Sequence, residues 1–149
     1  MLIADIYHKS FITIDHSARI AEALALCIKH RINGLIVVDD KNHVVGVLSV
    51  QDIAAATIPS QFRQNPDMAA AMYTRGFFHQ MCREVAKKSV STIMRRKFES
   101  VGLDDNIMSV TAEFLKNDLY ILPVIEKKQL IGIITRSQIK SALARGMEI

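Results

Sequence analysis

The chain contains one pattern of residues twice, at positions 5–53 and again at 92–139. Each copy begins with a short strand-like segment, continues with an apolar helical stripe and two β-like runs, and ends at the start of another helix. The copies keep a constant offset up to a polar turn, where the second copy is one residue shorter. A surface turn tolerates such a deletion. Two copies therefore predict one repeated β-α-β-β-α unit.

The repeat predicts a mixed α/β (α+β) fold. A three-stranded sheet with helices on one face leaves its other face open, and a second unit packed there would cover it. We therefore expect two repeats, residues 1–56 and 89–149, packed as a pseudo-two-fold pair, with residues 57–88 between them. Asn33 and Gly34 are expected to end the first helix, because both residue types accept a left-handed backbone.

The segment between the repeats is expected to be helical. Asn65, Pro66 and Asp67 are typical of a helix start, with a capping residue, a proline in the first turn and an early acid. The segment also holds four of the nine aromatic residues, which argues against a disordered linker. Packing over the edge of the repeats is the first expectation, and a dimer or partner surface is the alternative.

Composition limits the classes of function. The chain is 50% apolar and 23% charged, which suits a globular protein with a real core. No apolar run approaches the length that spans a bilayer, and the first residues lack a signal sequence, so we expect a cytoplasmic protein without a membrane partner. Cys27 and Cys82 are expected to be free, buried thiols.

The distribution of charge argues against a nucleic-acid partner. The net charge of +4 divides into −1 for residues 1–56, +3 for 57–88 and +2 for 89–149. A nucleic-acid-binding protein would concentrate a larger basic excess on one element.

The order of blocks in the second copy carries a family resemblance. A helical stripe is followed by Leu122-Pro123-Val124-Ile125-Glu126, then by Leu130-Ile131-Gly132-Ile133-Ile134-Thr135 and a helix start. This order resembles the CBS domain, named after cystathionine β-synthase, and the tandem copies resemble the CBS pair or Bateman module. The resemblance implies a regulatory module that takes AMP, ADP, ATP or S-adenosylmethionine in clefts between the repeats. It also implies a homodimer and, for a free-standing pair, a separate effector protein.

In the first repeat, the resemblance implies a ribose contact by Asp52. The family's most diagnostic position is the acid three residues after the Ser or Thr that ends the third strand, here Ser49. A carboxylate there can accept hydrogen bonds from both ribose hydroxyls, while Ser49 and the helix start suit phosphate oxygens. The same Ser-x-x-Asp pattern is also a capping box, which needs no ligand. The residues alone slightly favour the cap, and the two roles can coexist.

In the second repeat, the corresponding positions are Thr135 and Gln138. Gln138 replaces the family's usual aspartate, so it can complete a capping box but lacks the charge that strengthens a diol contact. Arg136 could hold a phosphate, although an arginine in the first turn of a helix is more often solvated.

The resemblance also implies contacts to adenine from the backbone around the second strand of each repeat. These positions are Gly34, Leu35 and Ile36 in the first copy, and Ile121, Leu122 and Pro123 in the second. Only the second copy keeps the family's proline, and the N–H gained at Ile36 could pair with the sheet. Thr13 and Ser100 occupy strand-start positions that often face the cleft in this family, although Thr13 is also simply a good strand former.

The sequence offers no set of catalytic residues. It has no Walker-type phosphate loop and no nucleophile elbow, and its five histidines lack the spacing of a metal site. We therefore expect neither enzymatic activity nor a metal or required cofactor. The predicted function is regulatory sensing of an adenine nucleotide or adenosyl metabolite. The alternative is a ligand-independent dimerisation module, or scaffold, whose clefts are empty or filled by side chains.

Overall fold

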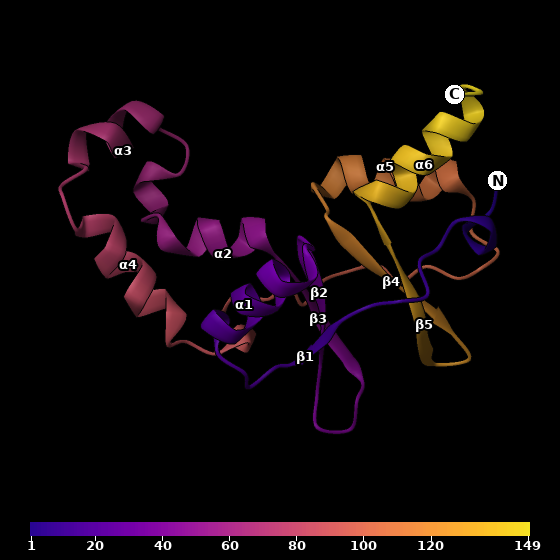
Figure 1. The fold of residues 1–149 in the computed structure, drawn as a ribbon, viewed down its shortest axis with the longest axis horizontal. Helices are drawn as coiled ribbons and strands as arrows, with labels where there is room; N and C mark the ends of the chain where they lie inside the picture. Colours follow the sequence, from indigo (N-terminus) through magenta and orange to yellow (C-terminus); the bar gives the residue numbers. More distant parts are fainter.

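The computed structural model describes all 149 residues as two α/β units joined by a helical segment (Figure 1). The first unit and the segment contain β1 (Thr13–Asp15), α1 (Ile20–His30), β2 (Gly34–Val38), β3 (Val44–Ser49), α2 (Val50–Thr57), α3 (Pro66–Met72) and α4 (Phe77–Ala86). The second unit contains α5 (Ile107–Asn117), β4 (Ile121–Glu126), β5 (Gln129–Thr135) and α6 (Arg136–Gly146). This order confirms the predicted fold of two repeats with an extra helical segment. None of the helices combines the length and apolar character needed to cross a bilayer.

The two sheets differ in one strand. In the first, β1 pairs in parallel with β2, and β2 pairs antiparallel with β3. In the second, β4 and β5 form an antiparallel hairpin, and the expected leading strand shrinks to a single parallel bridge between Val101 and Val124. The prediction of a three-stranded second sheet is therefore wrong. Ile36 donates its N–H to the Ile12 carbonyl at 3.3 Å, as expected, whereas Pro123 at the equivalent position has no N–H to donate.

The N-terminal segment of each repeat crosses to the other repeat. His8 exchanges two backbone hydrogen bonds with Ile133, both of 2.9 Å. Arg95 exchanges two with Val47, of 2.8 and 3.0 Å. Gly132 permits the close approach of the first segment, because a Cβ there would lie 2.6 Å from the His8 carbonyl oxygen. The crossing places His8 beside β5 and Arg95 at the equivalent point beside β3.

In β2 and β4, alternate side chains pack into different hydrophobic cores. Leu35 and Val37 of β2 pack under α1, whereas Ile36 and Val38 pack against the second unit. The inter-repeat core consists of five buried residues, Ile36, Val38, Val47, Ile121 and Ile133. The two sheets therefore cover each other's open faces, as the period-two pattern requires.

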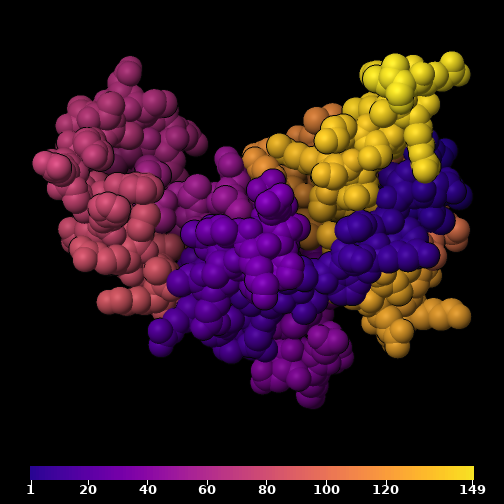
Figure 2. All heavy atoms as spheres, in the orientation of Figure 1, coloured from indigo at the N-terminus to yellow at the C-terminus, as the bar shows by residue number.

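The inter-repeat segment packs through one of its two helices. Asn65 caps α3 by accepting a hydrogen bond from the Met68 N–H at 3.0 Å, with Pro66 in the first turn, so the predicted helix start is confirmed. The helix stops at Met72, and α4 begins after Gly76, whose φ of 88° breaks the path. Buried Val85 anchors α4 to the first unit, while α3 has no buried residue. Figure 2 shows α3 and α4 as a lobe set apart from the second unit.

Two local expectations need correction. The left-handed residues that end α1 and α5 are Arg31, with φ of 54°, and Asp118, with φ of 49°. Gly34 instead begins β2, where a Cβ would lie 2.9 Å from Ile121 Cγ2, so close contact between the repeats requires the glycine. Both cysteines are free, but only Cys27 is buried, and burial raises the pKa of its thiol. Cys82 is half-buried.

Candidate functional site

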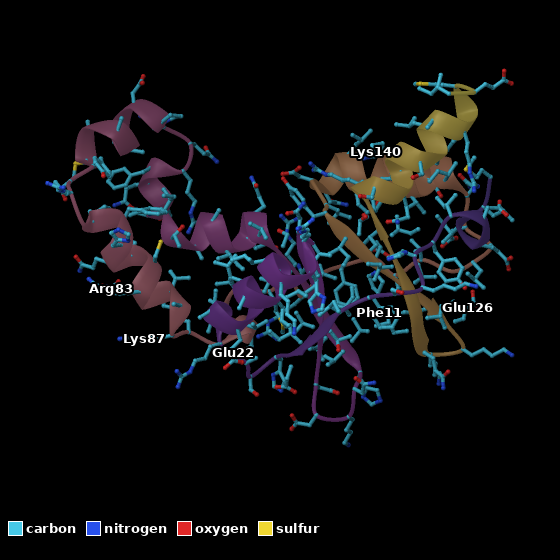
Figure 3. The ribbon with its side chains drawn as sticks, in the orientation of Figure 1. Phe11, Glu22, Arg83, Lys87, Glu126 and Lys140 are labelled. Carbon is cyan, nitrogen blue, oxygen red and sulfur yellow. The ribbon has the colours of Figure 1, made fainter.

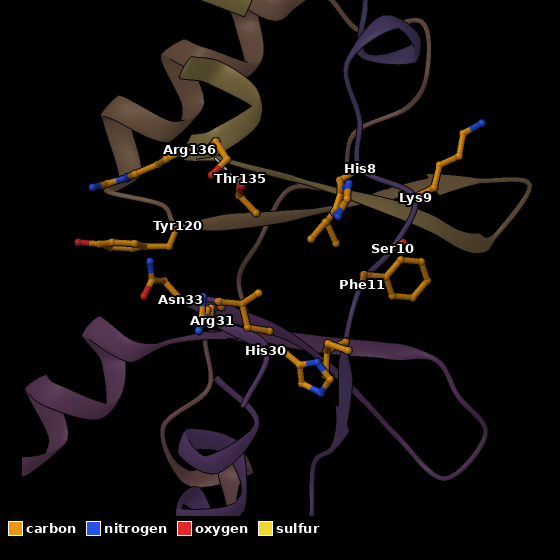
Figure 4. A pocket seen from close by; sticks show the side chains of 15 residues that line it. His8, Lys9, Ser10, Phe11, His30, Arg31, Asn33, Tyr120, Thr135 and Arg136 are labelled. Carbon is orange, nitrogen blue, oxygen red and sulfur yellow. Dashed lines mark hydrogen bonds between the residues drawn. The ribbon is translucent and has the colours of Figure 1, made fainter. Parts of the chain in front are cut away.

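A cavity of about 760 Å³ lies between the two repeats, and we call it the open cleft. Its lining comes from residues 8–12 and 30–34 of the first repeat, and from Tyr120, Ile133 and residues 135–137 of the second. Figure 4 shows Thr135 and Arg136 on one side of this space and His30, Arg31 and Asn33 on the other. The open cleft is therefore built by segments that only the packing of the two repeats brings together.

One end of the open cleft is formed by a stacked arginine. The Arg136 guanidinium lies 4.0 Å from the centre of the Tyr120 ring (Figure 4). Arg136 Nε donates to the Leu119 carbonyl at 3.1 Å, and Nη2 donates to Asp118 Oδ1 at 2.9 Å. These contacts fix Arg136 as a wall of the cavity.

The start of α6 borders the same cavity. Thr135 caps this helix, because its hydroxyl oxygen accepts a hydrogen bond from the Ser137 N–H at 3.2 Å. The Gln138 amide oxygen accepts hydrogen bonds from the Thr135 N–H at 3.0 Å and from its hydroxyl at 2.7 Å. The predicted capping box at Gln138 is thus confirmed.

A second cleft lies at the equivalent place between the repeats, shares Tyr120 with the open cleft and is almost filled. We call it the closed cleft: its lining includes Ser49, Asp52, Arg95 and Ile121, and its volume is about 10 Å³. Arg95 Nε donates to Asp52 Oδ1 at 2.9 Å, and Arg95 Nη1 donates to the Asn117 carbonyl at 3.0 Å. The side chains of Asp52 and Arg95 are only 13% and 33% exposed, so water screens this pair poorly.

Both carboxylate oxygens of Asp52 are engaged. Oδ1 accepts from Arg95, while Oδ2 accepts from the N–H of Ser49 at 2.9 Å and from its hydroxyl at 2.8 Å. Ser49 in turn accepts from the Asp52 N–H at 3.1 Å, which completes the predicted capping box. A ribose could reach the Asp52 carboxylate only after Arg95 had left.

The two clefts differ at equivalent positions of the repeat. His8 in the open cleft stands where Arg95 stands in the closed one, and Gly34 stands where Ile121 does. Gln138 is the equivalent of Asp52. The open cleft therefore lacks both partners of the ion pair that fills the closed cleft.

The predicted site residues lie in three places: in the open cleft, in the closed cleft, and outside both. Gly34, Thr135 and Arg136 line the open cleft. Ser49, Asp52 and Ile121 line the closed cleft. The remaining predicted residues line neither, namely Thr13, Leu35, Ile36, Ser100, Leu122, Pro123 and Gln138. The four at the centres of β2 and β4, Leu35, Ile36, Leu122 and Pro123, are fully buried.

The sequence prediction missed twelve of the fifteen residues that line the open cleft. It did not include residues 8–12, residues 30–33, Tyr120, Ile133 or Ser137. The constant offset of 87 residues between the copies aligns His8 with Arg95 and Asn33 with Tyr120, so these positions could have been compared. Both clefts include a residue from the N-terminal segment of a repeat because those segments cross.

One group of polar side chains has the composition of a metal site. Single ligand atoms of Asp15, His16 and Asp40 lie within 4.8 Å of one another, outside both clefts. Hydrogen bonds from the hydroxyl and N–H of Ser17 hold the pKa of Asp15 below its usual range. His16 Nε2 lies 3.9 Å from Asp40 Oδ1, and these contacts account for the cluster without an ion.

Comparison with known sequences identifies the repeats. The family model of the CBS domain matches residues 3–58 and 90–145. The chain is 28% identical over 139 residues to L-aspartate semialdehyde sulfurtransferase of Methanocaldococcus jannaschii, covering 93% of this chain and 22% of that protein. It is also 28% identical over 135 residues to the chloroplastic CBS domain-containing protein CBSX2 of Arabidopsis thaliana, covering 87% of this chain and 57% of that protein. The chain thus spans only part of these relatives.

Solved structures show the same architecture. The CBS domain pair of protein MJ0100, in complex with 5′-methylthioadenosine and S-adenosyl-L-methionine, matches with a TM-score of 0.69 and 28% identity over 96% of this chain and 99% of that one. CBSX2 in complex with AMP matches with a TM-score of 0.70 and 22% identity over 98% of each chain. Because the family model matches most of its length, the chain belongs to the CBS domain family and contains two CBS domains in tandem.

Proposed function

We propose that this CBS pair is a regulatory module that binds an adenine nucleotide or an adenosyl metabolite in the open cleft. The observation that carries the proposal is the cavity of about 760 Å³ between the repeats, a size within the range of roughly 300–1,000 Å³ typical of small-molecule sites. The complexes of MJ0100 and CBSX2 with adenosine derivatives support it.

The lining of the open cleft suits the parts of a nucleotide. Ile12, Ile32 and Ile133 offer apolar walls for a base, and Gly34 leaves room beside them. The Thr135 hydroxyl and the first turn of α6 suit sugar or phosphate oxygens. Among the residues predicted from the sequence, Gly34, Thr135 and Arg136 are therefore our proposed ligand contacts.

A ligand in the open cleft can act as a signal because both repeats contribute to it. Such a ligand binds one relative packing of the repeats more tightly than another, and it shifts the equilibrium by that difference. We propose that a second protein, or a second copy of this chain, responds to the change in packing.

The first test is a thermal-shift titration of the wild type and Asp52→Ala with AMP, ADP, ATP, S-adenosylmethionine and 5′-methylthioadenosine. A ligand at a hundredfold excess over its Kd should stabilise the protein by about 2.7 kcal/mol. Asp52→Ala should lower the unfolding temperature without ligand, because it removes the carboxylate that accepts from Ser49 in the capping box and leaves Arg95 without its carboxylate partner. The ligand-induced shift should persist in the variant, and its loss would contradict the placement in the open cleft.

The alternative function is a ligand-independent scaffold. The filled closed cleft favours it, because there a side chain already occupies the place of a ligand. If none of the five ligands shifts the unfolding temperature of the wild type, the scaffold becomes the better account.

We also propose that the module forms a homodimer through its exposed helical faces. Ile28 on α1 and Leu115 on α5 occupy equivalent positions of the two repeats and are 71% and 79% exposed. Exposed apolar side chains of this kind mark an interaction surface. By analytical ultracentrifugation, the wild type should be a dimer and Leu115→Glu a monomer. Met72→Glu on α3 is the matched control and should remain a dimer, so a monomeric wild type or control would contradict this interface.

A further inference from the structure

The charges around the open cleft are of one sign. Its lining includes Lys9, Arg31 and Arg136 but no aspartate or glutamate. Arg136 is already paired with Asp118, and Figure 4 shows Lys9 turned outward at the rim. Arg31 is the third cation, and no carboxylate lies within 4.0 Å of its side chain. The structure thus provides one unpaired arginine on the wall of the cavity.

Comparison with the closed cleft shows where carboxylates could have been. The equivalents of Asp52 and Asp118 are Gln138 and Arg31. Of these four residues, Asp52 lines the closed cleft and Arg31 lines the open cleft, so the open cleft carries a cation and no acid. A positively charged ligand group would find no carboxylate in the lining, whereas a negatively charged group would meet Arg31.

We infer that the open cleft selects adenine nucleotides by their phosphates and disfavours S-adenosylmethionine, with Arg31 as the discriminating residue. The inference rests on the function proposed above for the same cleft. Arg31 lies at the left-handed end of α1, across the cavity from Thr135 at the start of α6 (Figure 4), and Ser137 also lines the cavity. Phosphate oxygens between these groups would receive a charge-assisted contact from one repeat and neutral hydrogen bonds from the other. S-adenosylmethionine carries a sulfonium and an ammonium against a single carboxylate, so its net charge is positive and Arg31 disfavours it relative to ATP.

Isothermal titration calorimetry with AMP, ADP, ATP, S-adenosylmethionine and 5′-methylthioadenosine tests the inference. Affinity should rise with the number of phosphates and fall with added salt, because Arg31 is exposed. Arg31→Glu should weaken ATP binding by roughly tenfold or more, about 1.4 kcal/mol, and leave binding of uncharged 5′-methylthioadenosine unchanged. Arg83→Glu is the matched control: it makes the same charge change on the exposed face of α4 (Figure 3) and should bind ATP as the wild type does.

A second variant, Arg31→Gly, tests the same residue without introducing an opposite charge. Arg31→Glu replaces the cation by an anion, whereas Arg31→Gly removes the charge alone and suits the φ of 54° at this position. Arg31→Gly should also lose ATP affinity and keep 5′-methylthioadenosine affinity. Equal affinities for ATP and S-adenosylmethionine, or unchanged ATP binding in both Arg31 variants, would overturn the inference while leaving the proposed function intact. Failure of every adenine ligand to bind the wild type would overturn both.

Discussion

Replacing His8 with arginine and Gln138 with aspartate in one chain is expected to weaken ligand binding at the open cleft by roughly a hundredfold. The two substitutions transplant the Arg95–Asp52 pair onto the equivalent positions of the other cleft. The carbonyl of His30 stands at the position equivalent to that of Asn117, which accepts the second hydrogen bond of Arg95. A ligand would have to displace these charge-assisted contacts, which at about 1.5 kcal/mol each implies a loss of roughly a hundredfold in affinity.

The single substitutions are the controls for this transplant. His8→Arg alone introduces the guanidinium without its carboxylate partner, and Gln138→Asp alone introduces the carboxylate without the guanidinium. Each single variant should retain most of the calorimetric binding, because the closing pair is incomplete. A double variant that folds and binds its ligand as the wild type does would show that the Arg95–Asp52 pair is not what closes the other cleft.

Ile36→Ala is expected to cost about 2–5 kcal/mol of unfolding free energy, because it leaves a cavity in the core between the repeats. Ile36 is fully buried there with Val38, Val47, Ile121 and Ile133. It was predicted from the family resemblance as an adenine contact, yet its side chain lines neither cleft. The main effect of the substitution should therefore appear in chemical denaturation of the ligand-free protein.

Ile149→Ala is the matched control for Ile36→Ala, because it removes the same atoms from a side chain that is 91% exposed. Its unfolding free energy should remain within about 0.5 kcal/mol of the wild type. If Ile36→Ala were as stable as this control, the two sheets would not depend on each other for their stability.

Local sequence signals were sufficient for most of the fold. The repeat predicted that each unit covers the open sheet face of the other, and Ile36 and Val38 of β2 do pack there against Ile121 and Ile133. The Ser49-x-x-Asp52 and Thr135-x-x-Gln138 patterns predicted helix starts, because a capping box is completed within four residues. The prediction gave the second sheet one strand too many. Pro123 has no N–H to donate to a neighbouring strand, and the expected strand is reduced to a single bridge at Val101.

Local sequence patterns could not predict which cleft is open and which is filled by side chains. Asp52 was identified as the residue for a ribose, but its carboxylate pairs with Arg95, 43 residues away in the sequence. That contact depends on the crossing of the N-terminal segments of the two repeats, which is set by backbone hydrogen bonds to β3 and β5. Neither copy alone indicates that one cleft is filled and the other open. The ribose role of Asp52 remains a prediction, one that requires Arg95 to move.

The number of ligands bound per chain shows which of the two clefts is a ligand site. Calorimetric titration of the wild type with the adenine ligand that gives the largest thermal shift measures this number. We expect one ligand per chain, because the open cleft offers about 760 Å³ and the closed cleft about 10 Å³. Two ligands per chain would show that Arg95 yields its place at Asp52, and none would show that the open cleft is not a ligand site.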